Sequence, residues 1–304
     1  MKIGIDLGGT KIEGVLINDQ DLVMQRFRVP SPSSDYHAII RSIAEMVRKF
    51  DDEAEKINET NVQHKPSVGV GLPGSVSLKT GKMKNANTTC LNDQPFKEDL
   101  QATLGRKVKI ENDANCFVLS EAIAGSGKPY KSVFGVILGT GTGGGIVVDK
   151  KLLPSRNRVA GEWGHNPMPW IASDELNKRS CYCGKLGCIE TFLSGPGLQN
   201  TYSLHGGAAV LNAEEIVDLA RNADQFAMNV LHKYLDHLAK GLASIMNIID
   251  PQVIVMGGGL SNIDEIYQQV PKLMANYVFG NDCEVALLPS KLGDSSGVFG
   301  AAYL

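Results

Sequence analysis

The opening segment of the chain recurs in its second half, and this repeat restricts the possible folds more than any other feature. IGIDLGGTKIEGVLIND, which starts at Ile3, aligns without a gap with FGVILGTGTGGGIVVDK, which starts at Phe134. Each segment contains an apolar strand, a glycine-rich turn and a second apolar strand. Glycine turns between strands are common, so a chance likeness of two hairpins is the alternative explanation. Because the match covers both strands and the turn, we interpret it as a duplication.

The chain has 304 residues, more than a single hydrophobic core usually supports, so two domains are expected. Apolar runs of strand length alternate with segments of helical periodicity, which is typical of α/β proteins. Gly125 to Pro129 carries residues that commonly end a helix, and we place the change of domain there. We expect an N-terminal α/β domain over 1–125, a C-terminal α/β domain over 126–293, and a last helix over 294–304 that joins the first domain. Periodicity also predicts helices over 36–54, 213–221, 226–249 and 264–277.

Composition and charge exclude several partners. Charged residues make up 21% of the chain and the net charge is −3, which provides no basic surface for nucleic acid or for an anionic membrane. No apolar run reaches the roughly 18 residues that a membrane-spanning helix needs. Met1 leads directly into KIGIDLGG, without the charged and apolar regions of a signal peptide. We expect a cytoplasmic protein with neither nucleic acid nor a membrane among its partners.

Three glycine-rich turns follow predicted strands. DLGGTK at 6–11 is followed by another strand, so it matches neither the P-loop nor the dinucleotide fingerprint, both of which lead into a helix. Its glycines expose backbone N–H groups, while Thr10 and Lys11 add a hydroxyl and a positive charge for phosphate oxygens. Asp6, at the strand end, is placed to hold Mg²⁺ through water. Together with LGTGTGGG at 138–145 and GGGL at 257–260, these turns predict a nucleotide site between two domains.

Five further motifs carry a family resemblance: NANTTCLN, ENDANC, AGEWGHNPMPW, CYCGKLGCIETFLSG and GDSSGVFGAA. With them the chain resembles, from Met1 to Leu304, the ROK family of bacterial sugar kinases and sugar-responsive repressors, and most closely its fructokinase/mannokinase branch. The resemblance implies an actin-like ATPase (ribonuclease H-like) fold, in which two duplicated α/β domains surround a nucleotide cleft. It also implies ATP and Mg²⁺ as cofactors. The implied nucleotide-binding residues are Asp6, Gly8, Gly9, Thr10, Lys11, Gly139, Thr140 and Gly141 at the phosphates, and Gly257, Gly258, Gly259 and Leu260 along the adenosine.

The segment ENDAN at 111–115 lies where a strand gives way to a helix. A sugar kinase needs a carboxylate to accept the proton of the attacking hydroxyl, and Asp113 is a candidate. From the residues alone, an N-cap role for Asp113 is equally well supported. The resemblance implies that Asp113 is the catalytic base and that Asn112 binds the sugar. It also places Glu162, His165 and Glu190 on the sugar, and Gly74 of the GLPG segment in a loop beneath the acceptor.

The stretch CYCGKLGCIE, in the expected second domain, holds three of the six cysteines within eight positions. In a reducing compartment such a cluster indicates a metal site or a redox centre more often than a disulfide. Cys181, Cys183 and Cys188 supply three thiolates, and tetrahedral zinc needs a fourth ligand, which is often histidine. The resemblance makes His165 that ligand, with its second ring nitrogen on the sugar. Because the phosphate loops lie elsewhere in the chain, we expect changes in this structural zinc site to leave ATP affinity unchanged.

The motifs favour phosphorylation of fructose, and also of mannose, on the 6-hydroxyl, chiefly through the likeness around Trp163 and residues 166–170. The alternative is the same chemistry on N-acetylglucosamine or glucose, since one sequence does not reveal the space near the second carbon of the sugar. A sugar-sensing repressor is a weaker alternative, because the first phosphate-loop strand starts at residue 2 and leaves no room for a DNA-binding region. The resemblance further implies a homodimer.

Overall fold

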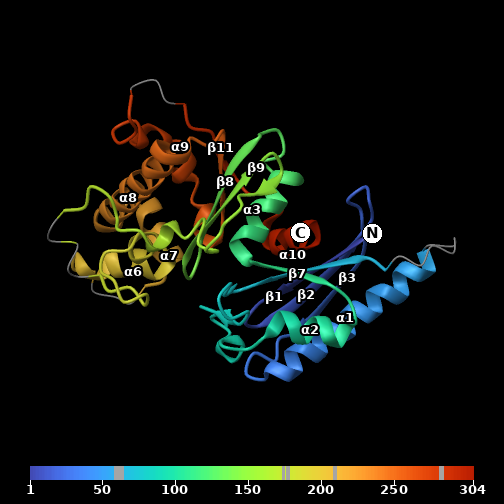
Figure 1. Cartoon of the computed structure of the whole chain (residues 1–304). Coiled ribbons are helices and arrows are strands. Elements are labelled where there is room, and N and C mark those ends of the chain that lie inside the picture. Colours follow the sequence, from blue (N-terminus) through green and yellow to red (C-terminus); the bar gives the residue numbers. More distant parts are fainter. Residues whose placement is uncertain (58–64, 173–174, 176–178, 208–210, 281–283) are drawn as a thin grey trace. The chain divides into compact units, whose positions relative to one another are not determined.

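The structure is a computed structural model that describes residues 1–57, 65–172, 175, 179–207, 211–280 and 284–304. The chain forms two compact units (Figure 1), which are described separately below. The first comprises Met1–Glu121, Pro154–Val159 and Asp294–Leu304, and the second comprises Ala122–Leu153 and Ala160–Gly293. The domain bounds expected from the sequence, 1–125 together with 294–304 and then 126–293, stay a prediction. Among the described residues, none of the helices is both long and apolar enough to cross a bilayer.

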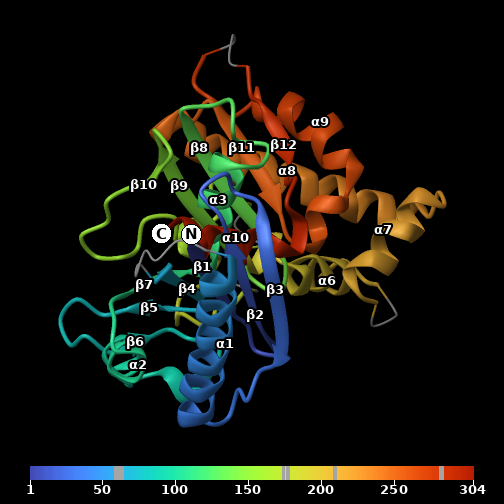
Figure 2. The ribbon, with the colours of Figure 1, turned by 90° about the vertical axis from the view of Figure 1, so that its right-hand side faces the viewer.

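The first unit is built on a five-stranded sheet with the order β3-β2-β1-β4-β7. Strands β1, β2 and β3 are antiparallel neighbours, whereas β4 and β7 run parallel to β1. Figure 2 shows α1 running alongside β2 and β3. The bounds of this unit's elements are β1 Lys2–Leu7, β2 Lys11–Ile17, β3 Val23–Pro30, α1 Tyr36–Ile57, β4 Ser67–Leu72, β5 Ser75–Val76, β6 Met83–Lys84, η1 Thr89–Leu91, α2 Phe96–Leu104 and β7 Val108–Asn112, with α10 Ser296–Tyr303 from the end of the chain. Helix α3, Asp113–Ile123, follows β7.

The two faces of this sheet are covered differently. One face buries Ile3, Ile5 and Leu7 against apolar residues of α1 and α2, which forms the main core of the unit. On the opposite face the backbone of α10 approaches the sheet very closely. A side chain at Gly4 would overlap with the carbonyl oxygen of Val298 in α10. Glycine is therefore required there for the final helix to reach the sheet.

The second unit contains a sheet of the same design, with the order β10-β9-β8-β11-β12. Its first three strands in sequence are antiparallel neighbours, and β11 and β12 run parallel to β8. The strands are β8 Ser132–Leu138, β9 Thr142–Val148, β10 Lys151–Leu152, β11 Val253–Gly257 and β12 Leu287–Pro289. The ungapped repeat aligns β2 with β9 over their full lengths. The duplication predicted from the sequence is confirmed by this shared topology.

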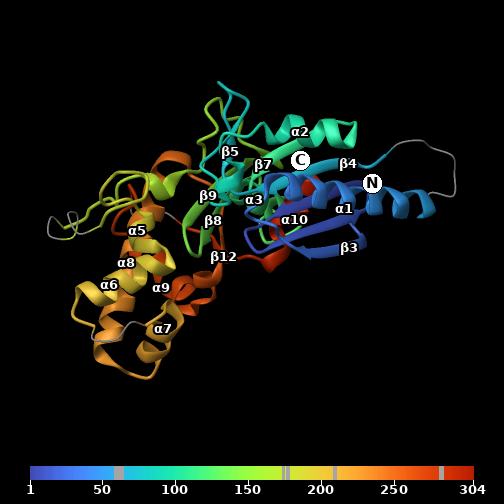
Figure 3. The same ribbon diagram turned by 90° about the horizontal axis from the view of Figure 1, so that it is seen from below.

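Helices of the second unit pack together beside its sheet, as Figure 3 shows for α6, α7, α8 and α9. The elements are η2 Trp163–His165, α5 Glu190–Leu193, α6 Gly195–Leu204, α7 Ala213–Arg221, α8 Gln225–Ile249, η3 Gly259–Asn262 and α9 Asp264–Met274. The short helix η4, Gly293–Ser295, begins at the last residue of this unit and continues into the first. Helix α7 begins with a capping box, in which Asn212 and Glu215 each accept the other's backbone N–H. Helix α8 ends at Asp250, which adopts a left-handed conformation.

Candidate active site

The first glycine-rich turn joins β1 to β2 in the first unit. The Gly8 amide donates to the carbonyl oxygen of Lys11 over 2.9 Å, which closes the turn. Its outer end is fixed by Ser31, whose amide donates to the carbonyl of Thr10 over 3.0 Å. Gly9 and Thr10 are exposed, and a Cβ atom at Gly9 would meet nothing within 4 Å. The turn thus offers backbone N–H groups and a lysine to an approaching anion.

Asp6 lies near the end of β1, just before this turn, and its carboxylate is close to those of Asp113 and Glu13. Burial, followed by repulsion from Asp113 and Glu13, raises the pKa of Asp6 to about 7, and Lys11 offsets this only in part. A Cβ atom on Gly297 of α10 would lie 3.0 Å from an Asp6 carboxylate oxygen, so the helix backbone restricts access of water on that side. A carboxylate that resists ionisation in this way gains from a nearby cation, and its hard oxygen atoms fit Mg²⁺.

Glu13 is the neighbour of Asp6 on β2 and is only 1% exposed. Burial would raise its pKa, but hydrogen bonds from Arg28 and Arg26 outweigh burial and lower the pKa of Glu13. The Arg28 Nη2 atom is 2.6 Å from Glu13 Oε2, and Lys11 Nζ is 3.7 Å from the same oxygen. Glu13 therefore also holds the lysine of the turn. This network was not identified from the sequence. The signal was the alternation of Arg26 and Arg28 on β3, opposite Glu13 on β2.

In the ENDAN segment, the sequence left open whether Asp113 is the N-cap of the following helix or a catalytic base. Asn112 ends β7, and its Oδ1 atom accepts the amide hydrogen of Asn115 over 2.8 Å. Asn112 therefore caps the helix, and Asp113 is the first helical residue. Asp113 Oδ1 accepts the amide hydrogen of Ala114 over 2.8 Å. Glu111 accepts from Arg158 over 3.2 Å, which fixes residues 154–159 to the first unit and was not foreseen.

Gly74 lies in the turn between β4 and β5 of the same unit. Its φ of +85° is left-handed, and a Cβ atom there would be 2.6 Å from the carbonyl oxygen of Lys84. The geometry of the turn alone is thus sufficient to require glycine.

The second glycine-rich turn joins β8 to β9. The Gly139 amide donates to the carbonyl of Gly141 over 3.0 Å, and the Gly139 carbonyl accepts from Gly195 over 2.8 Å. The Thr142 amide donates to Glu190 Oε2 over 3.0 Å. The predicted sugar residue Glu190 therefore contacts a predicted phosphate loop, which the sequence did not suggest.

A pocket of about 490 Å³ lies next to this turn, within the second unit. Four predicted nucleotide-binding residues, Gly139, Thr140, Gly259 and Leu260, line it. Gly257 ends β11, and Gly258 has a φ of +83° and lies against the backbone of Leu138. Helices α6 and α7, to which sequence reasoning gave no role in nucleotide binding, supply Gly195, Pro196, Gln199, Ala213, Glu214, Val217, Asp218 and Arg221 to the lining, which Asn262 and Ile263 complete.

His165 and Glu162 belong to the segment around η2. Trp163 is buried, and its indole N–H donates to the Gly143 carbonyl over 2.9 Å, which fixes η2 on β9. The His165 Nε2 atom is 2.9 Å from the Tyr182 hydroxyl. Burial, and then the charges of Glu190 and Glu162, raise the pKa of Tyr182 to about 12. Tyr182 thus lies near all three predicted sugar residues of this unit, and only its position between two cysteines could have suggested it.

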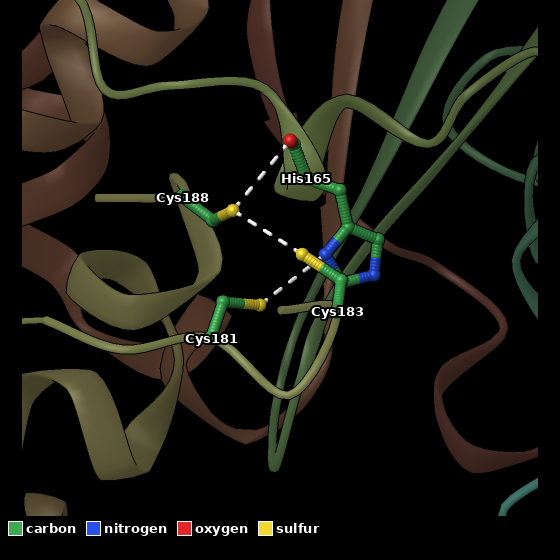
Figure 4. Close-up of side chains that lie close together, drawn as sticks. All are labelled: His165, Cys181, Cys183 and Cys188. Carbon is green, nitrogen blue, oxygen red and sulfur yellow. Dashed lines mark hydrogen bonds between the residues drawn. The ribbon is translucent and has the colours of Figure 1, made fainter. Parts of the chain in front are cut away.

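The three cysteines and His165 converge on one point, as Figure 4 shows. Their ligand atoms all lie within 4.8 Å of one another. The sulfur atoms of Cys183 and Cys188 are 3.6 Å apart, and the Cys181 sulfur is 3.5 Å from His165 Nδ1. Around tetrahedral Zn²⁺, with Zn–S of about 2.3 Å and Zn–N of about 2.0 Å, these separations are about 3.8 Å and about 3.5 Å. The four residues fit zinc, with Nδ1 as the ligand atom and Nε2 facing Tyr182.

The cysteine loop is supported by a buried arginine that the sequence did not reveal. Arg179 is 1% exposed, and its guanidinium lies 4.0 Å from the ring centroid of Phe192. It donates to the Thr191 carbonyl over 2.6 Å and to Thr201 Oγ1 over 2.9 Å, while its own carbonyl accepts from Gly187 over 2.8 Å. Arg179 therefore connects the cysteine loop to α5 and α6.

The predicted residues form one group in each unit. The first unit holds Gly74, Asn112 and Asp113 with the first glycine turn, and the second holds the remaining sugar residues, the cysteine cluster and the pocket. Two sheets with the same strand order, each opening with a glycine-turn hairpin, define the actin-like ATPase fold. The chain belongs to the ROK family, whose model matches residues 2–304.

Relatives of known name match along the whole chain. The N-acetyl-D-glucosamine kinase of Vibrio atlanticus is 39% identical, and the match covers 100% of this chain and 99% of that protein. The ROK hexokinase of Thermus thermophilus is 28% identical, with a TM-score of 0.85 and coverage of 100% and 97%. A ROK glucokinase of Streptomyces griseus, solved with glucose and AMPPNP, is 27% identical, with a TM-score of 0.74 and coverage of 99% and 97%.

The preference for fructose expected from the sequence is wrong. Three curated relatives that match the full chain at 37% to 39% identity are all named N-acetyl-D-glucosamine kinases. Trp163, one of the residues weighed for fructose, has a different explanation, because it is buried and its indole N–H donates to β9. Its position reflects how η2 packs and gives no information about which sugar is bound.

Proposed function

We propose that the protein is an ATP-dependent kinase that phosphorylates N-acetyl-D-glucosamine. The observation that carries the proposal is the 39% identity to a kinase of that name over the full length of both chains. The two glycine turns provide backbone amides for phosphate oxygens, and the pocket of about 490 Å³ beside the second turn has the size of a small-molecule site. The acceptor is the 6-hydroxyl, which is the only primary alcohol of this sugar and the least hindered nucleophile.

In the proposed reaction, the oxygen of the sugar 6-hydroxyl bonds to the γ-phosphorus of ATP while Asp113 accepts the proton of that hydroxyl. The bond between the γ-phosphorus and the bridging oxygen of the β-phosphate breaks. ADP and the sugar phosphate are the products. Asn112 Oδ1 is committed to the start of α3, so its amide nitrogen is the group offered to a sugar hydroxyl. Glu162, Glu190 and His165 bind other hydroxyls. Asp6 would hold Mg²⁺, which when bound neutralises phosphate charge.

Zinc, in this proposal, is structural. Three cysteines and His165 would supply all four ligands of a tetrahedral zinc, so no position would remain for a reacting water. Burial, together with the neighbouring sulfur atoms of Cys183 and Cys181, raises the pKa of Cys188 to about 12 when no cation is present. A bound metal charge would therefore be needed to keep Cys188 in the thiolate form. Homodimer formation remains a prediction from the resemblance, and a cytoplasmic location remains a prediction from the sequence.

A coupled ADP-release assay with a panel of sugars tests the proposal. We expect kcat/KM for N-acetyl-D-glucosamine to exceed that for fructose, mannose and glucose by about tenfold or more, because the site must bind the acetamido group rather than merely admit it. NMR of the product identifies the phosphorylated hydroxyl. A higher kcat/KM for glucose or fructose, or no turnover with any of these sugars in the presence of MgATP, would contradict it.

A further inference from the structure

Glu190 touches the second glycine turn in two ways. Its Oε2 atom accepts the amide hydrogen of Thr142, the first residue of β9, over 3.0 Å. A Cβ atom on Gly141 would lie 2.8 Å from the same oxygen, closer than such atoms approach in folded proteins. The carboxylate therefore occupies the space that glycine leaves open at position 141.

The turn is also bonded to the far end of the short segment that Glu190 begins. The Gly195 amide donates to the Gly139 carbonyl over 2.8 Å, and the Ser194 amide donates to the Glu190 carbonyl over 3.1 Å. One segment, residues 190–195, thus holds the start of the turn through a main-chain amide and its end through a carboxylate. Glycine residues can adopt many backbone conformations, so the hydrogen bonds from Gly195 and to Glu190 determine the shape of the turn.

The segment 190–195 is itself fixed by buried groups. The Thr191 amide and hydroxyl both donate to the Cys188 carbonyl, over 2.9 Å and 2.7 Å. Arg179 donates to the Thr191 carbonyl over 2.6 Å. Glu190 is therefore attached on one side to the cysteine cluster and on the other to the turn.

We propose that Glu190 is a positioning residue for the nucleotide as well as a ligand of the sugar. By accepting the Thr142 amide, it holds the turn in the shape that presents the other amides to the phosphates. This inference rests on the proposed function, since it assumes that the turn binds a nucleotide. It also removes the basis for expecting ATP affinity to be independent of the cysteine loop, because the loop that carries Cys188 continues directly into Glu190.

The experiment is calorimetric titration of MgADP, without sugar, into Glu190→Ala and Glu190→Gln. A carboxylate near a phosphate also repels it, so comparison with the native residue alone mixes two effects. Both variants lack the charge, and only glutamine keeps an oxygen that can accept from Thr142. We expect the alanine variant to bind MgADP about fivefold more weakly than the glutamine variant, as for loss of one hydrogen bond. Glu162→Ala and Glu162→Gln are the matched controls and should bind it equally.

A second pair of variants covers the case in which Glu190→Ala does not fold, as judged by thermal melting. Gly141→Ala places a methyl group against Oε2 and should weaken MgADP binding by several-fold. In the Glu190→Asp background the carboxylate is one methylene shorter and no longer reaches the methyl group, so the effect of Gly141→Ala should largely disappear. An equal effect in both backgrounds would mean that the methyl group blocks the phosphate directly, which contradicts the inference.

The outcomes separate this inference from the proposed function. If the native protein binds MgADP and phosphorylates N-acetyl-D-glucosamine, but the two Glu190 variants bind MgADP within twofold of each other, only the positioning role is overturned. If the native protein does not bind MgADP at all, the proposed function fails and the positioning role fails with it.

Discussion

Asp113 and Asn112 are adjacent, yet the structure gives them separable duties. Because the Asn112 side chain caps α3, replacing Asp113 does not remove the helix cap. Asp113→Asn keeps an oxygen for the Ala114 amide and removes only the basic carboxylate. We expect kcat to fall on the order of 10² or more, with little change in melting temperature. Steady-state kinetics and thermal melting check this, and near-normal turnover would remove Asp113 from the mechanism.

A matched variant at the neighbouring position sharpens the test. Asn112→Ser keeps an oxygen acceptor for the cap, since serine is a good N-cap residue, but loses the amide nitrogen offered to the sugar. This change should raise KM for the sugar more than it lowers kcat. The two variants together distinguish proton transfer from sugar binding at positions that are one residue apart.

The cysteine loop is the element that the proposed zinc ion would stabilise directly. Cys183→Ser removes a thiolate from the cluster, and we expect zinc content to fall from about one equivalent and the melting temperature to fall by about 5 °C or more. Cys90→Ser, a half-buried thiol in the first unit, is the control and should change neither. Elemental analysis of protein purified without chelator measures the metal. Less than about half an equivalent in the native protein, with full activity after exhaustive chelation, would leave the cluster without this role.

The ends of a helix could be predicted where neighbouring residues cap it. They could not be predicted where contacts with distant residues decide where it stops. Helix α7 follows the predicted 213–221 because its capping box is written in the adjacent residues Asn212 and Glu215. Helix α9 was predicted to reach Tyr277 but ends at Met274. The apolar pattern continues past the helix because the Tyr277 ring packs on Trp170 and its hydroxyl donates to Asp236 over 2.6 Å. Tyr277 therefore extends the helical spacing of apolar residues, although it is partly buried by contacts with distant residues and lies outside the helix.

For the whole molecule, the duplication was visible because each copy of the hairpin is continuous in sequence. The strand order of the two sheets was not predicted and comes from the structure. The candidate site was predictable only where a motif carried it. The bond between Thr142 and Glu190 joins residues 48 positions apart, and no sequence pattern marks it. Arg179, Tyr182 and the pocket walls from α6 and α7 were missed for the same reason. The choice of sugar was wrong, and one residue that supported it, Trp163, serves packing rather than specificity.

Global stability should depend on pH through Asp6. Burial, Asp113 and Glu13 raise its pKa from 3.8 to about 7 in the folded protein. The folded chain therefore holds this proton more tightly than the unfolded chain does. The stability that the protonated group contributes is complete below about pH 4 and is lost as the pH rises toward 7. The full loss is at most about 4 kcal/mol, and relaxation of the site would reduce it.

Asp6→Asn, which is neutral at every pH, should avoid this loss. We expect its free energy of unfolding, measured by urea denaturation in EDTA, to come closest to that of the native protein at about pH 4 and to exceed it by about 1–3 kcal/mol at pH 8. Asp52→Asn, on the exposed side of α1, is the control for the removal of one surface carboxylate. Added Mg²⁺ should narrow the gap at pH 8, because a cation beside Asp6 favours its charged form. A gap that is constant with pH, or that widens toward acid, would show that Asp6 is ionised at little cost in the folded protein.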